Sequence, residues 1–142
     1  MAKFQFIFMS LVAVVWGVLV MAEYVFVAYD MNAGWMEEYS EPQRAWLAAV
    51  PSWVHAVFGA WATLLLVGAL FLVTRIQACV WMLGIAFLAQ IVLSVWASVF
   101  ADPTLVAMLG VQVWAVLALT LALTGLIYIY ARGEKRRRSG VL

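Results

Sequence analysis

Four long apolar runs constrain the fold of this chain more than any other feature. They cover residues 4–29, 51–74, 79–100 and 104–130. Each run exceeds the roughly 20 residues that an α-helix needs to cross a hydrocarbon core of about 30 Å. Because lipid offers no hydrogen-bond partners, the backbone of each run has to satisfy itself as a helix. Strands of a transmembrane barrel would alternate apolar and polar residues, and these runs do not alternate.

Composition excludes a soluble fold. The chain is 68% hydrophobic and 11% charged, whereas soluble domains are about 45–50% apolar and about 25% charged. We therefore expect an all-α membrane protein, with residues 1–142 forming one domain that is an antiparallel four-helix transmembrane bundle. The first run is too long for a signal peptide, and we expect it to be retained. The expected helices cover about 4–30, 51–75, 78–101 and 103–131, followed by a basic cytoplasmic tail, 132–142.

The distribution of Lys and Arg predicts the orientation. Arg44 is the only basic residue on one side, and the other seven of the eight lie on the side with both termini and the loop at Arg75. The positive-inside rule places both termini in the cytoplasm, and we expect a bacterial inner membrane. The tail would also attract anionic lipid headgroups, although its simpler role is to fix the topology.

The longest connection, residues 31–50, is predicted to lie outside. Ser40 and Gln43 have the spacing of a capping box, and Trp46 begins an apolar stripe. This pattern predicts a short helix that lies in the outer interface before Pro51 turns the chain inward. Aromatic belts account for most of the remaining aromatic residues near the boundaries, namely Trp35, Trp53 and Trp96 outside and Trp81, Tyr128 and Tyr130 inside.

One polar layer is the strongest candidate for a site. Glu23 lies inside the first apolar run, where an ionisable side chain is costly and is expected to face the bundle. Helical spacing puts Trp16 on the same face as Glu23. His55, Gln90 and Gln112 are predicted at a similar depth on the other three helices. Either these side chains join the helices in a hydrogen-bond network, or they line a polar cavity that opens outward and binds or relays a ligand.

Other chemistry is not expected. The single cysteine, Cys79, excludes an intrachain disulfide and a multi-cysteine metal site. No catalytic motif and no phosphate-binding loop is present, so we predict no enzymatic activity, no catalytic residue, no metal, no cofactor and no nucleic-acid partner. Trp16, Trp61 and Trp114 lie near mid-membrane and either fill the core or line a site for a flat ligand such as a quinone.

Two hypotheses for function follow. Ala115, Ala118, Ala122 and Gly125 form a stripe of small residues on the fourth helix, which lets helices approach closely. This favours a non-enzymatic accessory subunit of a larger membrane complex, or a self-associating bundle, whose partners are lipid and other transmembrane helices. The alternative is a small-solute transporter or ligand-binding protein that uses the polar layer. No inverted repeat or broken helix supports transport.

The chain also resembles a known family over roughly its first two thirds. The residues that carry the resemblance are Trp16, Glu23-Tyr24, Trp35-Met36, Glu41-Pro42-Gln43, Pro51-Ser52-Trp53, Trp61, Gly68, Arg75, Ala78 and Gln90. They are similar to those of small uncharacterised bacterial four-helix inner-membrane proteins, some labelled "sugar transporter". This chain departs from that family at the cytoplasmic turn, where Arg75 is the only basic residue. The resemblance implies a bacterial inner-membrane location and supplies no substrate.

Overall fold

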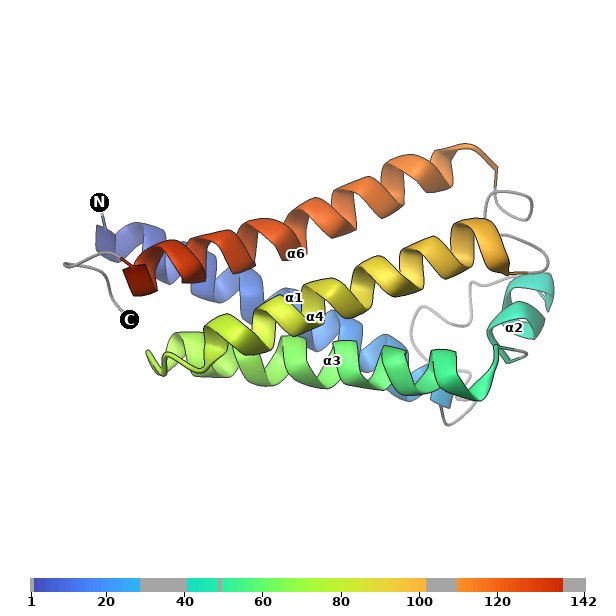
Figure 1. Ribbon diagram of the computed structural model, residues 1–142, viewed down its shortest axis with the longest axis horizontal. Coiled ribbons are helices and arrows are strands. Elements are labelled where there is room, and N and C mark those ends of the chain that lie inside the picture. Colours follow the sequence, from blue (N-terminus) through green and yellow to red (C-terminus); the bar gives the residue numbers. More distant parts are fainter. Residues whose placement is uncertain (1, 29–40, 49, 102–109, 137–142) are drawn as a thin grey trace.

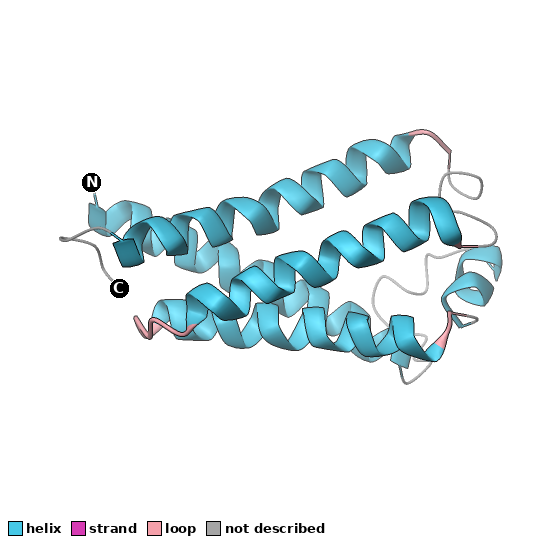
Figure 2. Cartoon of the chain, in the orientation of Figure 1, coloured by secondary structure: helices cyan, strands magenta, loops and turns pink. Residues whose placement is uncertain are grey.

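The computed structural model describes residues 2–28, 41–48, 50–101 and 110–136, and every regular element within them is helical (Figure 2). Four helices are long and apolar enough to cross a membrane. This confirms the predicted all-α four-helix bundle, and it fits a membrane protein. The elements are α1 (Ala2–Ala28), α2 (Glu41–Ala48), α3 (Ser52–Val73), α4 (Cys79–Val95) continued by the π-helical segment η2 (Trp96–Phe100), and α6 (Gln112–Arg136).

The bundle has two distinct ends (Figure 1). At one end α1 begins, α6 ends, and a tight turn joins α3 to α4; we call this the turn end. At the other end lies the short helix α2, and we call it the α2 end. Helix α3 packs along both α1 and α4, and α6 packs on α4 and has a smaller contact with α1. A short helix is thus present where the sequence predicts one, and its place in the membrane interface stays a prediction.

Small residues bring α1 and α3 together. Ala13 on α1 and Ala62 on α3 are fully buried. A Cβ atom added to Gly17 would lie 3.0 Å from the Cα atom of Leu66, closer than the 3.5–4.0 Å or so of ordinary carbon contacts. The outer surface carries large apolar side chains instead, among them Phe4, Leu11, Leu119 and Ile129. Small residues at the α1–α3 contact and large apolar side chains on the outer surface suit a bundle whose solvent is lipid.

The turn between α3 and α4 is a Schellman motif. The Arg75 N–H donates to the Leu72 carbonyl at 3.1 Å, and the Ile76 N–H donates to the Phe71 carbonyl at 2.8 Å. Arg75 takes the left-handed conformation with φ 61°, where glycine is usual. Its guanidinium lies 5.0 Å from the centre of the Phe6 ring. This cation–π contact ties the turn to α1.

The last helix differs from its prediction at both ends. It begins at Gln112 rather than near 103, since Gly110 has a φ of +96° that no α-helix contains. Residues 102–109, including the predicted cap Asp102-Pro103, lie outside the described residues, as does Ser40 of the predicted capping box. At its other end the helix continues to Arg136, so the first part of the predicted tail is helical. The apolar run shows neither end of the helix. Gly110 lies inside the run, and polar residues that favour a helix extend the helix beyond the end of the run.

Candidate functional site

Two adjoining hollows lie between the helices in the α2-end half of the bundle. One holds about 200 Å³ of space among α3, α4, η2 and α6. The other holds about 490 Å³ among α1, α3 and α6, within the range of small-molecule sites. Both are lined by Phe58, Trp61, Leu117 and Thr120. We call the first the inner hollow, the second the side hollow, and the two together the aromatic cavity.

A wall of contacting aromatic rings from α1 and α3 borders the aromatic cavity. The rings of Phe58 and Trp61 are 5.8 Å apart at an angle of 31°. Trp16 meets Trp61 edge-on at 6.4 Å, and Tyr24 meets Phe58 edge-on at 5.3 Å. Such pairs each contribute about 0.5–1.5 kcal/mol beyond the burial of their area. The wall is therefore a preformed apolar surface, suited to a ring or to a lipid-like chain.

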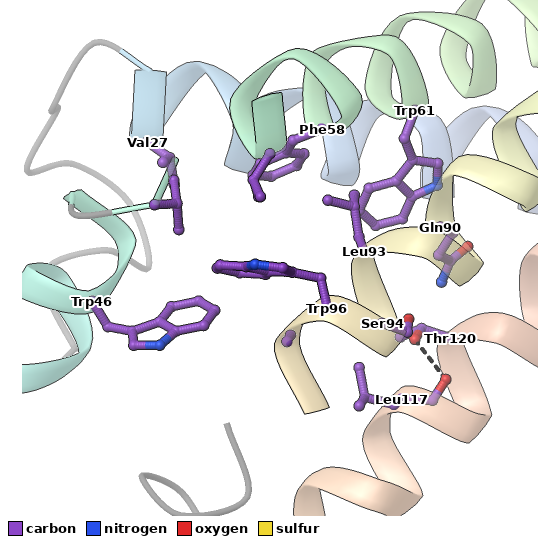
Figure 3. Close-up of a pocket in the computed structure, with 13 residues that line it drawn as sticks. Val27, Trp46, Phe58, Trp61, Gln90, Leu93, Ser94, Trp96, Leu117 and Thr120 are labelled. Atoms are coloured by element: carbon purple, nitrogen blue, oxygen red, sulfur yellow. Dashed lines mark hydrogen bonds between the residues drawn. The ribbon is translucent and has the colours of Figure 1, made fainter. Parts of the chain in front are cut away.

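Tryptophans from three elements close the α2 end of the inner hollow. Trp46 of α2 and Trp96 of η2 both line it, with ring centres 5.5 Å apart (Figure 3). Trp53 of α3 meets Trp96 edge-on at 6.1 Å. Trp96 is the first residue of the π-helical segment, and such segments redirect side chains and are frequent at functional sites. The short helix α2 thus serves as a cover over this end of the cavity.

Two side chains that line the inner hollow each carry a buried polar atom with no hydrogen-bond partner within the described part of the chain. These atoms are Oε1 of Gln90, a side chain that is only 2% exposed, and Nε1 of Trp61. Both side chains line the inner hollow (Figure 3). An unsatisfied buried polar group costs about 1–3 kcal/mol. The amide oxygen is a hydrogen-bond acceptor, and the indole N–H is a donor.

The threonines of α6 are already engaged in hydrogen bonds. Thr120 Oγ1 donates to the Leu117 carbonyl at 3.0 Å (Figure 3). Thr124 is fully buried, and its Oγ1 accepts a hydrogen bond from Trp16 Nε1 at 2.9 Å. This bond joins α1 to α6, and its donor Trp16 lines the side hollow.

The structure brings four of the predicted site residues to the aromatic cavity. Glu23 and Trp16 line the side hollow from α1, as their shared helical face predicts. Gln90 lines the inner hollow, and Trp61 lines both. Glu23 is half-buried and has an interaction of its own. A carboxylate, an amide and two indoles thus surround an otherwise apolar space.

The other three predicted residues do not line either hollow. Gln112 is exposed at the first residue of α6, because that helix begins later than predicted. Trp114 is 50% exposed and lies on the outer face of α6. His55 is half-buried near the start of α3, and its part in the predicted hydrogen-bond network stays a prediction. Matched depth along the membrane does not decide which way a side chain points around its helix.

Several lining residues were not expected from the sequence. Phe58 and Thr120 line both hollows, and Trp46 and Trp96 close one end. Phe58 precedes Trp61 by three residues, and this i, i+3 spacing was the available signal for a continuous aromatic face. The two tryptophans were assigned only to the membrane boundary, since an aromatic belt and a cavity cover have the same sequence pattern.

The donor set does not suit a metal. Within the described residues no three His, Cys, Asp or Glu side chains lie together. No family model matches the chain, and no curated protein or solved structure matches it. The chemistry of the cavity therefore carries the functional argument.

Proposed function

We propose that this chain is a non-enzymatic membrane protein that binds a small amphipathic molecule in the aromatic cavity. The observation that carries the proposal is that two side chains lining one apolar hollow have unpartnered buried atoms, the acceptor Gln90 Oε1 and the donor Trp61 Nε1. A hydroxyl-bearing ligand would satisfy both atoms and so recover their desolvation cost. Its apolar body would lie against Phe58 and Trp61.

The side hollow indicates the size of this ligand. It extends along α1 from Trp16 to Glu23, and seven residues correspond to about 10 Å of helix. This length suits one or two fused rings or a short branched chain. Glu23 lies toward the α2 end, where its carboxylate supports recognition of a second polar group.

We further propose that the protein resides in a bacterial inner membrane with its turn end in the cytoplasm. Of the eight Lys and Arg residues in the sequence, Arg44 is the only one that the predicted topology assigns to the side of the α2 end. By the positive-inside rule, this distribution supports a turn end in the cytoplasm. The aromatic cavity then opens toward the outer leaflet, so its ligand enters from lipid or from outside the cell.

Co-purification tests the proposal. We suggest isolating the wild-type protein, the Gln90→Met variant and the control variant Gln112→Met in mild detergent, then identifying bound small molecules by mass spectrometry. Gln112 is a matched control because it is exposed and lines neither hollow. We expect the wild type and the control to carry the same amphipathic molecule, and Gln90→Met to carry about tenfold less, the effect of losing one buried hydrogen bond.

Protein stability separates ligand binding from a structural role of Gln90. Removing an unsatisfied acceptor leaves the ligand-free protein equally stable or more stable. If Gln90→Met instead unfolds more easily with no change in bound molecules, the amide serves a structural network and the proposal is wrong. The proposal also fails if the wild type and Gln90→Met carry the same molecules in equal amounts.

A second candidate function is self-association or an accessory role in a larger complex. Ala115, Ala118 and Ala122 are exposed on α6, whereas Gly125 is covered by Phe87 of the same chain, whose ring carbon would lie 3.3 Å from an added Cβ. Three of the four small residues thus remain available to another helix, and we propose that a second copy or a partner subunit packs there.

Size measurement in detergent tests this second candidate. We expect a particle larger than a monomer, which Ala118→Leu with Ala122→Leu reduces to a monomer by blocking close approach. Ala56→Leu with Ala60→Leu is the matched control, because these alanines are exposed at the same spacing on α3. A wild-type protein that is already monomeric contradicts self-association, and an equal effect of both pairs contradicts the choice of face.

A further inference from the structure

A separate groove lies between α4 and α6 near the turn end. It holds about 390 Å³ and is lined chiefly by Trp81, Ile85 and Leu88 of α4 and by Tyr128 and Lys135 of α6. We call it the turn-end groove. It shares no lining residue with the aromatic cavity, so an inference from it does not depend on the proposed function.

The turn-end groove has an apolar floor and a charged mouth. Ile85 and Leu88 are 44% and 62% exposed, and they form a continuous apolar path along α4. Lys135 stands at the other extreme, in the last turn of α6, and lines the groove together with Val80 and Trp81 of α4. The positive charge thus lies beside the start of α4, where the apolar path begins.

Two aromatic side chains lie between the charge and the apolar floor. Trp81 is 54% exposed on α4. The ring of Tyr128 covers Gly84, where an added Cβ would lie 3.0 Å from the Tyr128 ring carbon Cε1. Tryptophan and tyrosine prefer the level of lipid headgroups, since one part of each is apolar and another forms hydrogen bonds. The order along the groove is therefore apolar, aromatic and cationic.

We infer that the turn-end groove binds one anionic phospholipid. The phosphate pairs with the Lys135 ammonium, the glycerol region lies beside Trp81 and Tyr128, and an acyl chain follows Ile85 and Leu88. The positive charge of Lys135 complements the anionic phosphate and supports this occupant. The path from residue 80 to residue 88 is about 12 Å long, which matches the upper half of an acyl chain. Free phosphate would leave this apolar path unoccupied.

Native mass spectrometry of the full chain tests the inference. We suggest titrating the detergent-solubilised protein with phosphatidylglycerol, with phosphatidylcholine as the neutral lipid, and comparing three variants. Lys135→Gln removes the charge, and Leu88→Trp fills the groove from an exposed position. Arg132→Gln is a matched control, since Arg132 is a basic, exposed residue of the same helix as Lys135 and does not line the groove. We expect one preferred phosphatidylglycerol, bound about fivefold more weakly after Lys135→Gln.

The variants distinguish a defined site from general attraction to basic residues. Weaker binding in Lys135→Gln and Leu88→Trp, with Arg132→Gln unchanged, supports the groove. An equal loss in Lys135→Gln and Arg132→Gln overturns it in favour of diffuse attraction, and unchanged binding in Lys135→Gln also overturns it. Added glycerol phosphate should not displace the lipid; complete displacement would show a phosphate site without a role for the acyl chain, and would contradict the inference.

Discussion

Replacing Gly17 by alanine tests the close contact between α1 and α3 that supports the aromatic wall. The new Cβ would lie 3.0 Å from the Leu66 Cα atom and 3.4 Å from the Leu66 nitrogen, so the two backbones have to separate by a few tenths of an ångström. Overpacking of this kind costs about 1–3 kcal/mol. Alanine recovers up to about 1 kcal/mol through its higher helix propensity. We therefore expect Gly17→Ala to lower the free energy of unfolding by about 1 kcal/mol.

Gly133→Ala is the matched control for this change. Gly133 is also within a helix, and an added Cβ there meets no atom within 4 Å. The control variant should gain up to about 1 kcal/mol from helix propensity alone, so the difference between the two variants isolates the packing cost. Reversible unfolding with a denaturing detergent, followed by tryptophan fluorescence, measures both. Equal stabilisation of the two variants would refute the close contact at Gly17.

Three further predictions concern the interhelical hydrogen bond, the turn and the topology. Thr124→Val should destabilise the protein, and a double-mutant cycle with Trp16→Phe should give a coupling of about 0.6–1.7 kcal/mol; no coupling would contradict the 2.9 Å bond. Because Arg75 has a φ of 61°, Arg75→Gly should leave the free energy of unfolding within about 1 kcal/mol of the wild type, and Arg75→Val should lower it by about 1–3 kcal/mol. Equal unfolding midpoints for both variants would contradict this left-handed conformation. A reporter fused after Leu142 should be active only in the cytoplasm and one inserted near Glu38 only outside, and periplasmic activity of the first would overturn the four-span topology.

The length and hydrophobicity of the apolar runs are sufficient to predict the four helices. Each run is too long and too apolar for a helix or strand of a soluble protein. In lipid, the backbone of such a run satisfies its hydrogen bonds by forming a helix. The start of the last helix was not predictable in the same way. Gly110 precedes the helix and has a φ of +96° that no α-helix contains, and the sequence around it is as apolar as the helix itself, so hydropathy does not show the boundary.

The sequence predicts how deep the candidate site residues lie in the membrane. It predicts only partly in which direction their side chains point around each helix. Glu23 and Gln90 were recognised because polar side chains in an apolar run have to face protein, and both line the aromatic cavity. Trp114 was assigned to the same level and is half-exposed on the outer face instead. A helix that is apolar all round carries little information about which face is buried. Packing with the other helices decides that direction, and one sequence does not record it.

The direct test of a ligand-binding aromatic cavity is an experimental density map of the protein in nanodiscs prepared with its native lipids. We predict non-protein density against the Phe58 and Trp61 rings, with a polar atom within hydrogen-bond distance of both Gln90 Oε1 and Trp61 Nε1. The contradictory result is a bundle in which α6 closes against α1 and α3, protein side chains fill the cavity, and the Gln90 amide is paired with another side chain of the protein.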